Sequence, residues 1–183
     1  LLRPQVGVVT GMAYTQFGGD ILPIEVNHFD GTGKFIITGQ LGDVMKESAS
    51  IALDYMKANR EKYGLQNIAF DKEDIHIHVP EGAVKKDGPS AGVSLTTAIL
   101  SAFSNRPVRD DVAMTGEITL RGQVLPIGGL KEKSISAHRS GIRKIIIPKD
   151  NAKDIDDIPK SVQADLDIVL ADHIDTVLEH ALI

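Results

Sequence analysis

One uncharged segment, residues 89–103, constrains the possible folds of this chain more than any other feature. It consists of small and apolar residues, among them Val93, Leu95, Ile99 and Phe103, and this pattern is typical of a buried helix. Pro89 suits the first turn of that helix, where a residue needs no backbone N–H donor. Like every other apolar stretch of the chain, the segment is shorter than the roughly 20 residues that a membrane-spanning helix requires. We therefore expect a helix in a protein core and no membrane partner.

Strands and helices are predicted on both sides of this segment. The predicted strands cover residues 6–9, 21–26, 34–38, 74–79, 112–115, 123–125, 144–147 and 168–170, with a turn at Gly18-Gly19-Asp20. The other predicted helices cover residues 43–63, 129–138 and 173–182. This order predicts an α/β (α+β) fold in which mixed β-sheets pack with helices.

Chain length and composition favour one domain over residues 1–183. The chain has 183 residues, of which 42% are hydrophobic but only 4% aromatic, so its core must be built mainly from Val, Ile, Leu, Ala and Met. It begins with Leu1-Leu2-Arg3-Pro4, without an initiator Met or a signal-peptide pattern. We therefore expect a segment of a longer protein.

Charge and cysteine content exclude several functions. The net charge is -5 and the basic residues are scattered, so there is no basic stripe of the kind that binds nucleic acid. The chain has no cysteine, which excludes disulfides, thiolate metal sites and a cysteine nucleophile. A reducing compartment such as the cytosol is compatible with this composition.

Ser90 is the first candidate for chemistry. If the buried helix begins at Pro89, Ser90 occupies its second position, where backbone N–H groups lack helical partners and attract negative charge. An oxyanion formed by attack of the serine on a carbonyl would be stabilised there. Most serines at such positions are only polar first-turn residues, and a serine hydroxyl needs a base to act as a nucleophile.

A candidate for that base is Lys133, in the predicted helix at residues 129–138. By helical periodicity Lys133 flanks the apolar face, whereas Lys131 points toward the charged side with Glu132 and Arg139. Burial lowers the pKa of a lysine, and a neutral lysine can take the proton of a serine. The alternative is a solvated helix lysine with no role.

Two rival sites are open on the residues alone. His78 and Asp87 could form a Ser/His/Asp triad with Ser90, although such a triad is defined by geometry rather than by nearness in sequence. His76 and His78 share one strand face and could bind a metal ion, but no third ligand follows at a convincing spacing.

Four motifs resemble, in order, those of the Lon protease family. They are Pro80-Glu81-Gly82-Ala83, Lys86-Asp87-Gly88-Pro89-Ser90-Ala91-Gly92, Met114-Thr115-Gly116-Glu117-Ile118-Thr119-Leu120-Arg121-Gly122 and Gly128-Gly129-Leu130-Lys131-Glu132-Lys133. The last is similar to the A-type branch. Residues 14–25 and 38–48 also resemble the family, so the likeness extends over essentially the whole chain.

The resemblance implies a fold and a set of site residues. The fold would be the Lon protease domain, which resembles the ribosomal protein S5 domain 2-like fold, with Ser90 as nucleophile and Lys133 as base. Thr115 would help to hold the lysine, and Glu25, His76 and His78 would line or support the site. The mobile active-site loop would contain the segment Asp87-Gly88-Pro89-Ser90-Ala91. A salt bridge from Asp87 to Lys133 could keep the lysine charged and inactive.

The resemblance also implies what the whole protein does. It would be an ATP-dependent serine endopeptidase acting on unfolded or damaged proteins, usually as a hexameric ring, in the cytoplasm or in the mitochondrial matrix of a eukaryote. The pattern G-x-x-x-x-G-K-[ST] does not occur in this chain. ATP and Mg would therefore be bound by an AAA+ domain outside it, and the isolated domain, with no cofactor, would show only ATP-independent peptidase activity.

Two other functions are compatible with parts of the sequence. A glycine-bearing turn before a helix is a general anion site, so the chain could be a phosphate- or nucleotide-binding module of the architecture used by small-molecule kinases. It could also be an interaction domain that has kept the fold and lost the chemistry, although Ser90 and Lys133 are both present.

Overall fold

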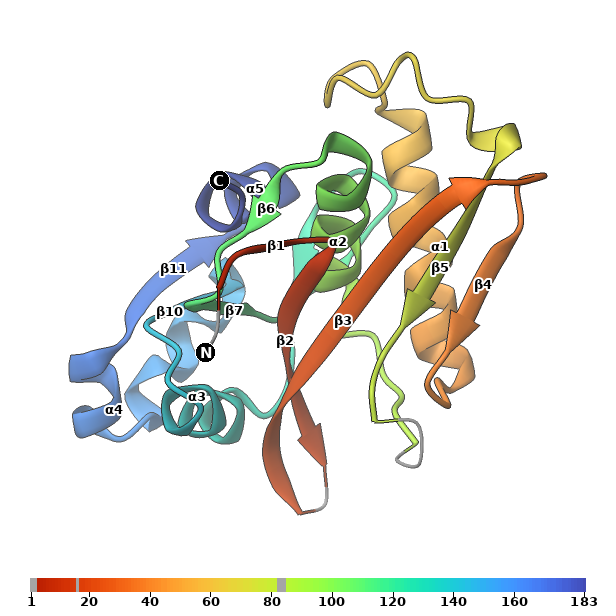
Figure 1. The fold of residues 1–183 in the computed structure, drawn as a ribbon. Helices are drawn as coiled ribbons and strands as arrows, with labels where there is room; N and C mark the ends of the chain where they lie inside the picture. The colour runs from red at the N-terminus through yellow and green to blue at the C-terminus, as the bar shows by residue number, and fades with distance from the viewer. Residues whose placement is uncertain (1–2, 16, 82–84) are drawn as a thin grey trace.

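A seven-stranded sheet forms the centre of the computed structural model, which describes residues 3–15, 17–81 and 85–183 (Figure 1). The strand order is β11-β10-β7-β2-β3-β5-β4. The strands are β2 Val8–Thr15, β3 Gly18–Asp30, β4 Phe35–Thr38, β5 Glu73–His78, β7 Val112–Met114, β10 Lys144–Pro148 and β11 Asp167–Ala171. Two short pairs lie outside it: β1 Gln5–Val6 with β6 Pro107–Val108, and β8 Glu117–Ile118 with β9 Val124–Leu125.

The sheet is mixed. Strand β7 runs parallel to β2 and β10, and β10 runs parallel to β11. Strand β3 runs antiparallel to both β2 and β5, whereas the edge strand β4 is parallel to β5. Together with the helices on its faces, this arrangement confirms the predicted fold class.

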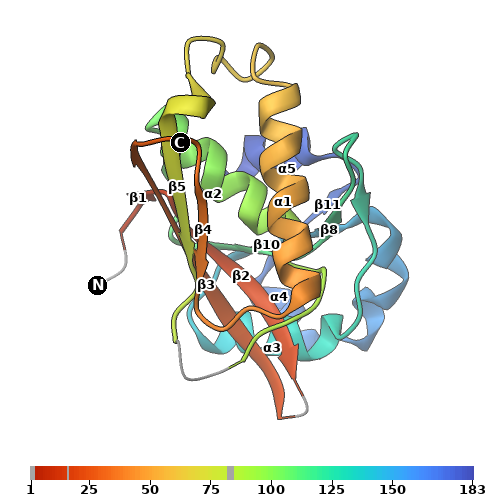
Figure 2. The ribbon, with the colours of Figure 1, turned by 90° about the vertical axis from the view of Figure 1, so that its right-hand side faces the viewer.

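Helices cover the sheet as two layers. The α-helices are α1 Asp43–Ala58, α2 Gly92–Ser104, α3 Leu130–Arg139, α4 Lys160–Asp165 and α5 Ile174–Ala181, and the 3-10 segments are η1 Phe70–Lys72 and η2 Lys149–Asp157. Helices α1, α2 and α5 pack on one face, and α3, α4 and η2 on the other. Figure 2 shows α1 and α2 beside the strands β3, β4 and β5, with α3 below.

Side chains of the central strands point alternately into these two helical layers. In β10, Ile146 packs into the core with α1, α2 and α5, whereas Ile145 and Ile147 pack into the core with α3 and α4. All three side chains are fully buried. Successive side chains of a strand point to opposite faces, so a continuous apolar run is what a strand covered on both sides requires.

The buried helix α2 begins later than predicted. It runs from Gly92 and is buried on every side up to Phe103, but residues 89–92 form a turn in which the Gly92 N–H donates to the Pro89 carbonyl. The N–H of Val93 donates to the carbonyl of Gly116, 3.0 Å away, in a distant segment. This tertiary contact sets the start of the helix, so Ser90 precedes the helix instead of occupying its second position.

Other boundaries also differ from the prediction. Helix α1 ends at Ala58, because the Asn59 side chain donates to the Tyr55 carbonyl and caps the end of the helix. Gly18 and Gly19 do not form the predicted turn but begin strand β3. The short helix α4 was not predicted, and neither was η2. Gly82 and Ala83 of the first motif lie outside the described residues, as do Leu1 and Leu2.

Candidate active site

A cleft of about 810 Å³ contains both Ser90 and Lys133 in its lining. Three segments far apart in the sequence form its walls. They are the β2–β3 hairpin with residues 13–15 and 20–23, the loop at residues 85–90, and residues 126–129 with Lys133 of α3. The fold therefore brings together the two residues that were predicted to form a dyad.

Lys133 lies at the end of the first turn of α3 and is only 2% exposed. This confirms the burial predicted from helical periodicity, and the neighbouring Lys131 is exposed as predicted. Burial lowers the pKa of Lys133 to about 8, because the charged ammonium loses hydration that the protein does not replace. A substantial fraction of such a lysine is neutral near physiological pH, as a general base requires.

Thr115 holds the lysine, as expected. The Lys133 Nζ donates to the Thr115 Oγ1 at 3.0 Å, and the threonine, itself buried, directly follows β7. The next residue, Gly116, donates its backbone N–H to the Ser90 carbonyl at 2.9 Å. Two consecutive residues thus contact the candidate base and the backbone of the candidate nucleophile.

Ser90 is half-buried in the turn before α2. The first two amides of that helix are already engaged, since the Gly92 N–H donates to Pro89 and the Val93 N–H to Gly116. The amides that can face an oxyanion are therefore those of the turn itself, and Pro89 has none. Ala91, buried at 3% exposure, is the N-cap residue of α2 and directly follows Ser90.

Lys86 anchors the loop that leads to Ser90. Its Nζ donates to the Gly39 carbonyl at 2.9 Å and also to the Glu81 carbonyl. Its backbone N–H donates to Gln40 and its carbonyl accepts from Gly42, so the loop runs along the segment after β4. Burial lowers the pKa of Lys86. The prediction had included Lys86 only as part of a motif.

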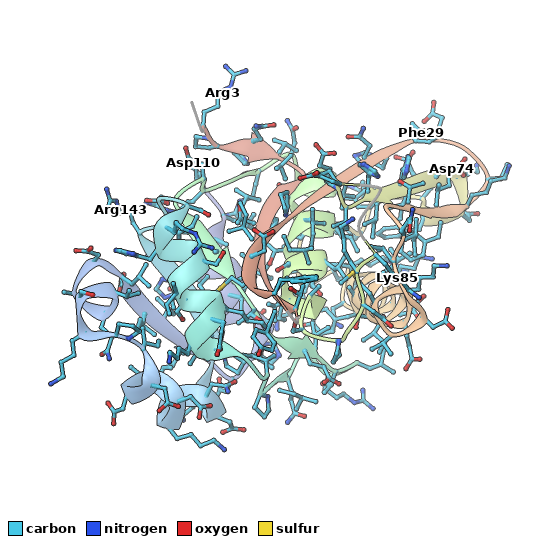
Figure 3. All side chains as sticks on the ribbon, turned by 90° about the horizontal axis from the view of Figure 1, so that it is seen from below. Arg3, Phe29, Asp74, Lys85, Asp110 and Arg143 are labelled. Carbon is cyan, nitrogen blue, oxygen red and sulfur yellow. The ribbon has the colours of Figure 1, made fainter. Side chains whose placement is uncertain are left out.

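Asp87 does not pair with Lys133. Its Oδ1 accepts the Met45 N–H at 3.0 Å, which caps the N-terminus of α1. Hydrogen bonds from the backbone amides of Met45, Gly88 and Val44 lower the pKa of the carboxyl. Figure 3 shows the neighbouring Lys85 beside the end of α1. The predicted Asp87–Lys133 salt bridge is wrong for this structure, because the amides of α1 bind the carboxylate.

The rival triad does not form either. The ring of His78 contacts the Thr38 hydroxyl, with 2.7 Å from Nδ1 to Oγ1, and Asp87 is bound to α1. The same hydroxyl lies 2.8 Å from the Nε2 of His76. Among the described residues no group of three or more metal-ligating side chains comes together, so the alternative metal site at His76 and His78 has no support.

Glu25, His76 and His78 share one face of the sheet and do not line the cleft, contrary to one of the two roles expected for them. Glu25 is exposed on β3 and pairs in register with His78 on β5. Both histidines contact the Thr38 hydroxyl, and the carbonyl of the next residue, Gly39, accepts a hydrogen bond from Lys86. This connection to the loop before Ser90 is compatible with a supporting role.

The β2–β3 hairpin lies directly against α3 at the lysine. A Cβ added to Gly19 would lie 2.1 Å from the Glu132 carbonyl oxygen, and one added to Gly129 would lie 2.7 Å from Cγ of Tyr14. Glycine at both positions allows this close approach. The prediction missed this contact, although the pair Gly18-Gly19 was a visible signal of an unusual backbone position.

The site combines a serine in a tight turn, a buried lysine of lowered pKa and an open cleft between a strand edge and a loop. These groups are those that a hydrolase with a Ser/Lys pair requires for acyl transfer. A sequence profile described as the Lon protease (S16) C-terminal proteolytic domain matches residues 2–183.

Curated relatives agree with this match. A Lon protease from Mycoplasma mycoides subsp. mycoides is 65% identical over 175 residues, which is 96% of this chain and 22% of the relative. Lon protease 1 of Bacillus subtilis is 61% identical over 179 residues, covering 98% of this chain and 23% of the relative. The chain therefore belongs to the Lon protease family, within its C-terminal proteolytic domain.

The match also bears on the alternatives and on the rest of the protein. The nucleotide-binding alternative finds no support in these relatives. The chain spans less than a quarter of the length of the relatives it matches. In the part of the chain that the structure describes, no helix is long and apolar enough to cross a membrane.

Proposed function

We propose that this domain hydrolyses peptide bonds, with Ser90 as the nucleophile and Lys133 as the general base. The observation that carries the proposal is the buried Lys133, whose pKa is lowered to about 8, in the cleft that Ser90 also lines. Neutral Nζ takes the hydroxyl proton while Oγ bonds to the scissile carbonyl carbon. The C–N bond then breaks, and the proton passes from Lys133 to the leaving amine.

The second half of the reaction uses the same groups. A water molecule attacks the acyl carbon, Lys133 takes a proton from it, and the proton returns to Ser90 when the acyl bond breaks. We assign stabilisation of the oxyanion to the amides of Ser90 and Ala91, because the amides of Gly88, Gly92 and Val93 already donate to other groups and Pro89 has none. In other enzymes, removing one such donor costs about 3 to 4 kcal/mol.

An extended substrate has a strand edge available beside the dyad. Asp20 to Pro23 of β3 line the cleft, and in the ladder β3 pairs with β5 only from Glu25 onward. A polypeptide that adds to this edge would run between β3 and the loop at residues 85–90. Such strand addition supplies affinity through main-chain hydrogen bonds that do not depend on substrate sequence.

Labelling of the nucleophile tests the proposal. A serine-directed fluorophosphonate should label the wild-type chain and not Ser90→Ala, and Lys133→Ala should slow the labelling strongly while leaving the fold intact by circular dichroism. Ser90→Ala should also lose turnover of a short fluorogenic peptide. Turnover by Ser90→Ala equal to that of the wild type would overturn the assignment.

For the whole protein we propose ATP-dependent proteolysis of unfolded or damaged proteins by a homo-oligomer, with a hexameric ring as the expected form. The names of the relatives and their greater length support this proposal. The motor that binds ATP and Mg would lie in the part that this chain does not include. An ATP-driven motor requires a compartment that holds ATP, and the cytoplasm, or the mitochondrial matrix in a eukaryote, meets this requirement.

A further inference from the structure

The outer part of the β2–β3 hairpin is a two-stranded ribbon that leaves the sheet. β2 pairs with β7 only at Thr10 and Gly11, and β3 pairs with β5 only from Glu25 onward. Beyond these points the two strands pair with each other alone. Figure 1 shows the hairpin projecting past α3. A ribbon of this kind is available to a partner along its length.

The ribbon is held against α3 close to its tip. Gly19, one residue pair before the turn, lies against the backbone of Glu132 in α3, so the ribbon cannot swing freely there. At the turn, the Thr15 hydroxyl donates to the Gly18 carbonyl at 3.2 Å and accepts the Phe17 N–H at 3.1 Å. These contacts connect Thr15 with Phe17 and Gly18, and the Phe17 side chain is exposed to solvent.

Phe17 is 90% exposed, the highest exposure of any large hydrophobic residue in the described chain. Tyr14, 54% exposed on the same ribbon, also lines the cleft that contains Ser90 and Lys133. Two exposed aromatic side chains thus lie on the outer part of the ribbon, and one of them, Tyr14, belongs to the cleft wall. A single exposed apolar side chain needs no explanation, but an aromatic pair that extends a cleft wall is typical of a binding surface.

We propose that Phe17, at the tip of this ribbon, is a contact outside the catalytic cleft for unfolded polypeptide, and that it binds an apolar or aromatic side chain several residues from the scissile bond. The proposal rests on the peptidase function above. A folded substrate keeps such side chains in its core, whereas an unfolded chain exposes them. The contact would favour long unfolded substrates over short peptides that fill only the cleft.

Binding to an inactive variant tests the contact without relying on turnover. Fluorescence anisotropy would measure the binding of a labelled, reduced and carboxymethylated α-lactalbumin, which stays unfolded, to Ser90→Ala and to Ser90→Ala/Phe17→Ala. We expect the Phe17 substitution to weaken binding about five- to tenfold, the range for truncating one aromatic contact. Phe17→Leu should restore part of the affinity.

Phe29→Ala is the matched control. Phe29 lies on the same strand β3, is 47% exposed, and pairs in register with Asp74 at the opposite end of the strand (Figure 3). This substitution should leave the affinity for the unfolded protein unchanged. In the active chain, Phe17→Ala should lower kcat/KM for the unfolded protein more than for a short peptide.

Three outcomes would overturn the inference. Equal affinities of the Phe17 and Phe29 variants would show that the ribbon tip does not bind the substrate. If Phe17→Ala lowered kcat/KM equally for short peptides and for the unfolded protein, Phe17 would act within the cleft. A changed assembly mass by light scattering, with unchanged binding, would assign Phe17 to a contact between copies. Failure of the peptidase proposal is separate, since it would show as turnover by Ser90→Ala.

Discussion

The Nζ of Lys133 lies 3.0 Å from the Oγ1 of Thr115, and this hydroxyl is neutral. The lysine is almost fully buried, and no ion pair joins its ammonium group to a carboxylate among the described residues. Burial therefore outweighs the hydrogen bond, and the pKa is lowered to about 8. A carboxylate in place of the threonine would have the opposite effect and keep the lysine charged.

The peptidase rate should follow the titration of this lysine. We expect kcat/KM for a short fluorogenic peptide to rise with pH through an apparent pKa of about 8 and then level off, because only neutral Lys133 accepts the Ser90 proton. Thr115→Val removes an acceptor from the ammonium form, so its midpoint should fall below that of the wild type, whereas Thr115→Ser should keep it. A rate that stays flat from about pH 6 to 9 would exclude Lys133 as the base.

The same titration should appear in stability. At pH 7 the native state holds a buried ammonium that the unfolded chain hydrates, so Lys133→Met should raise the free energy of unfolding by on the order of 2 kcal/mol. Above pH 8 the native lysine loses its proton before the unfolded one, whose pKa is about 10.4, so the wild type gains stability and the difference shrinks. Urea unfolding at several pH values measures this difference in the free energy of unfolding. Lys131→Met, at an exposed position, is the control, and an equal effect there would contradict the account.

Variants of Asp87 distinguish its role as a cap of helix α1 from a role as a charged partner of Lys133. Asp87→Asn keeps a side-chain oxygen for the Met45 amide, so it should leave the midpoint of the pH–rate profile unchanged. Asp87→Ala loses the cap, and we expect a lower Tm and a loss in kcat/KM of about tenfold as the Ser90 turn loosens. The pKa of the Asp87 carboxyl is lowered. The cap's contribution to stability is therefore present at pH values above the ordinary carboxyl pKa, and it is lost as the pH falls through the lowered pKa of the folded protein. A shift of the midpoint in Asp87→Asn would restore the salt-bridge hypothesis.

Gly19→Ala should impair the site from a distance. Its Cβ would lie 2.1 Å from the Glu132 carbonyl oxygen, so the hairpin must move away from α3 beside Lys133. We expect a lower Tm and a fall in kcat of about tenfold or more, since small displacements of reacting groups are costly. Gly128→Ala, where an added Cβ meets no atom within 4 Å, should keep the wild-type Tm. A Gly19→Ala variant with unchanged Tm and kcat would show that this contact is dispensable.

Periodicity along the chain predicted what depends on local pattern. It distinguished Lys133 from Lys131, because the face of a helix follows from spacing alone, and both exposures agree with the prediction. It also predicted the buried helix and the α/β class of the fold, whereas mixed sheets were expected with the family fold. The catalytic roles of these residues stay predictions until they are measured.

Contacts between distant segments caused the failures. The start of α2 depends on the bond from Val93 to Gly116, and no local pattern near Pro89 contains that information. Asp87 was expected beside Lys133, but the α1 amides, 42 positions away in sequence, bind its carboxylate. The pair Gly18-Gly19 resembled a turn, because the backbone of α3, which Gly19 approaches closely, lies far along the chain.

Thr115 and Gly116 are joined by one planar peptide unit, and they contact Lys133 and Ser90 respectively. The positions of base and nucleophile are thereby both tied to two consecutive residues directly after β7, although Lys133 and Ser90 belong to segments far apart in the chain. A displacement of β7 would carry both groups together. The base and the nucleophile can then keep their spacing while the surrounding domain deforms.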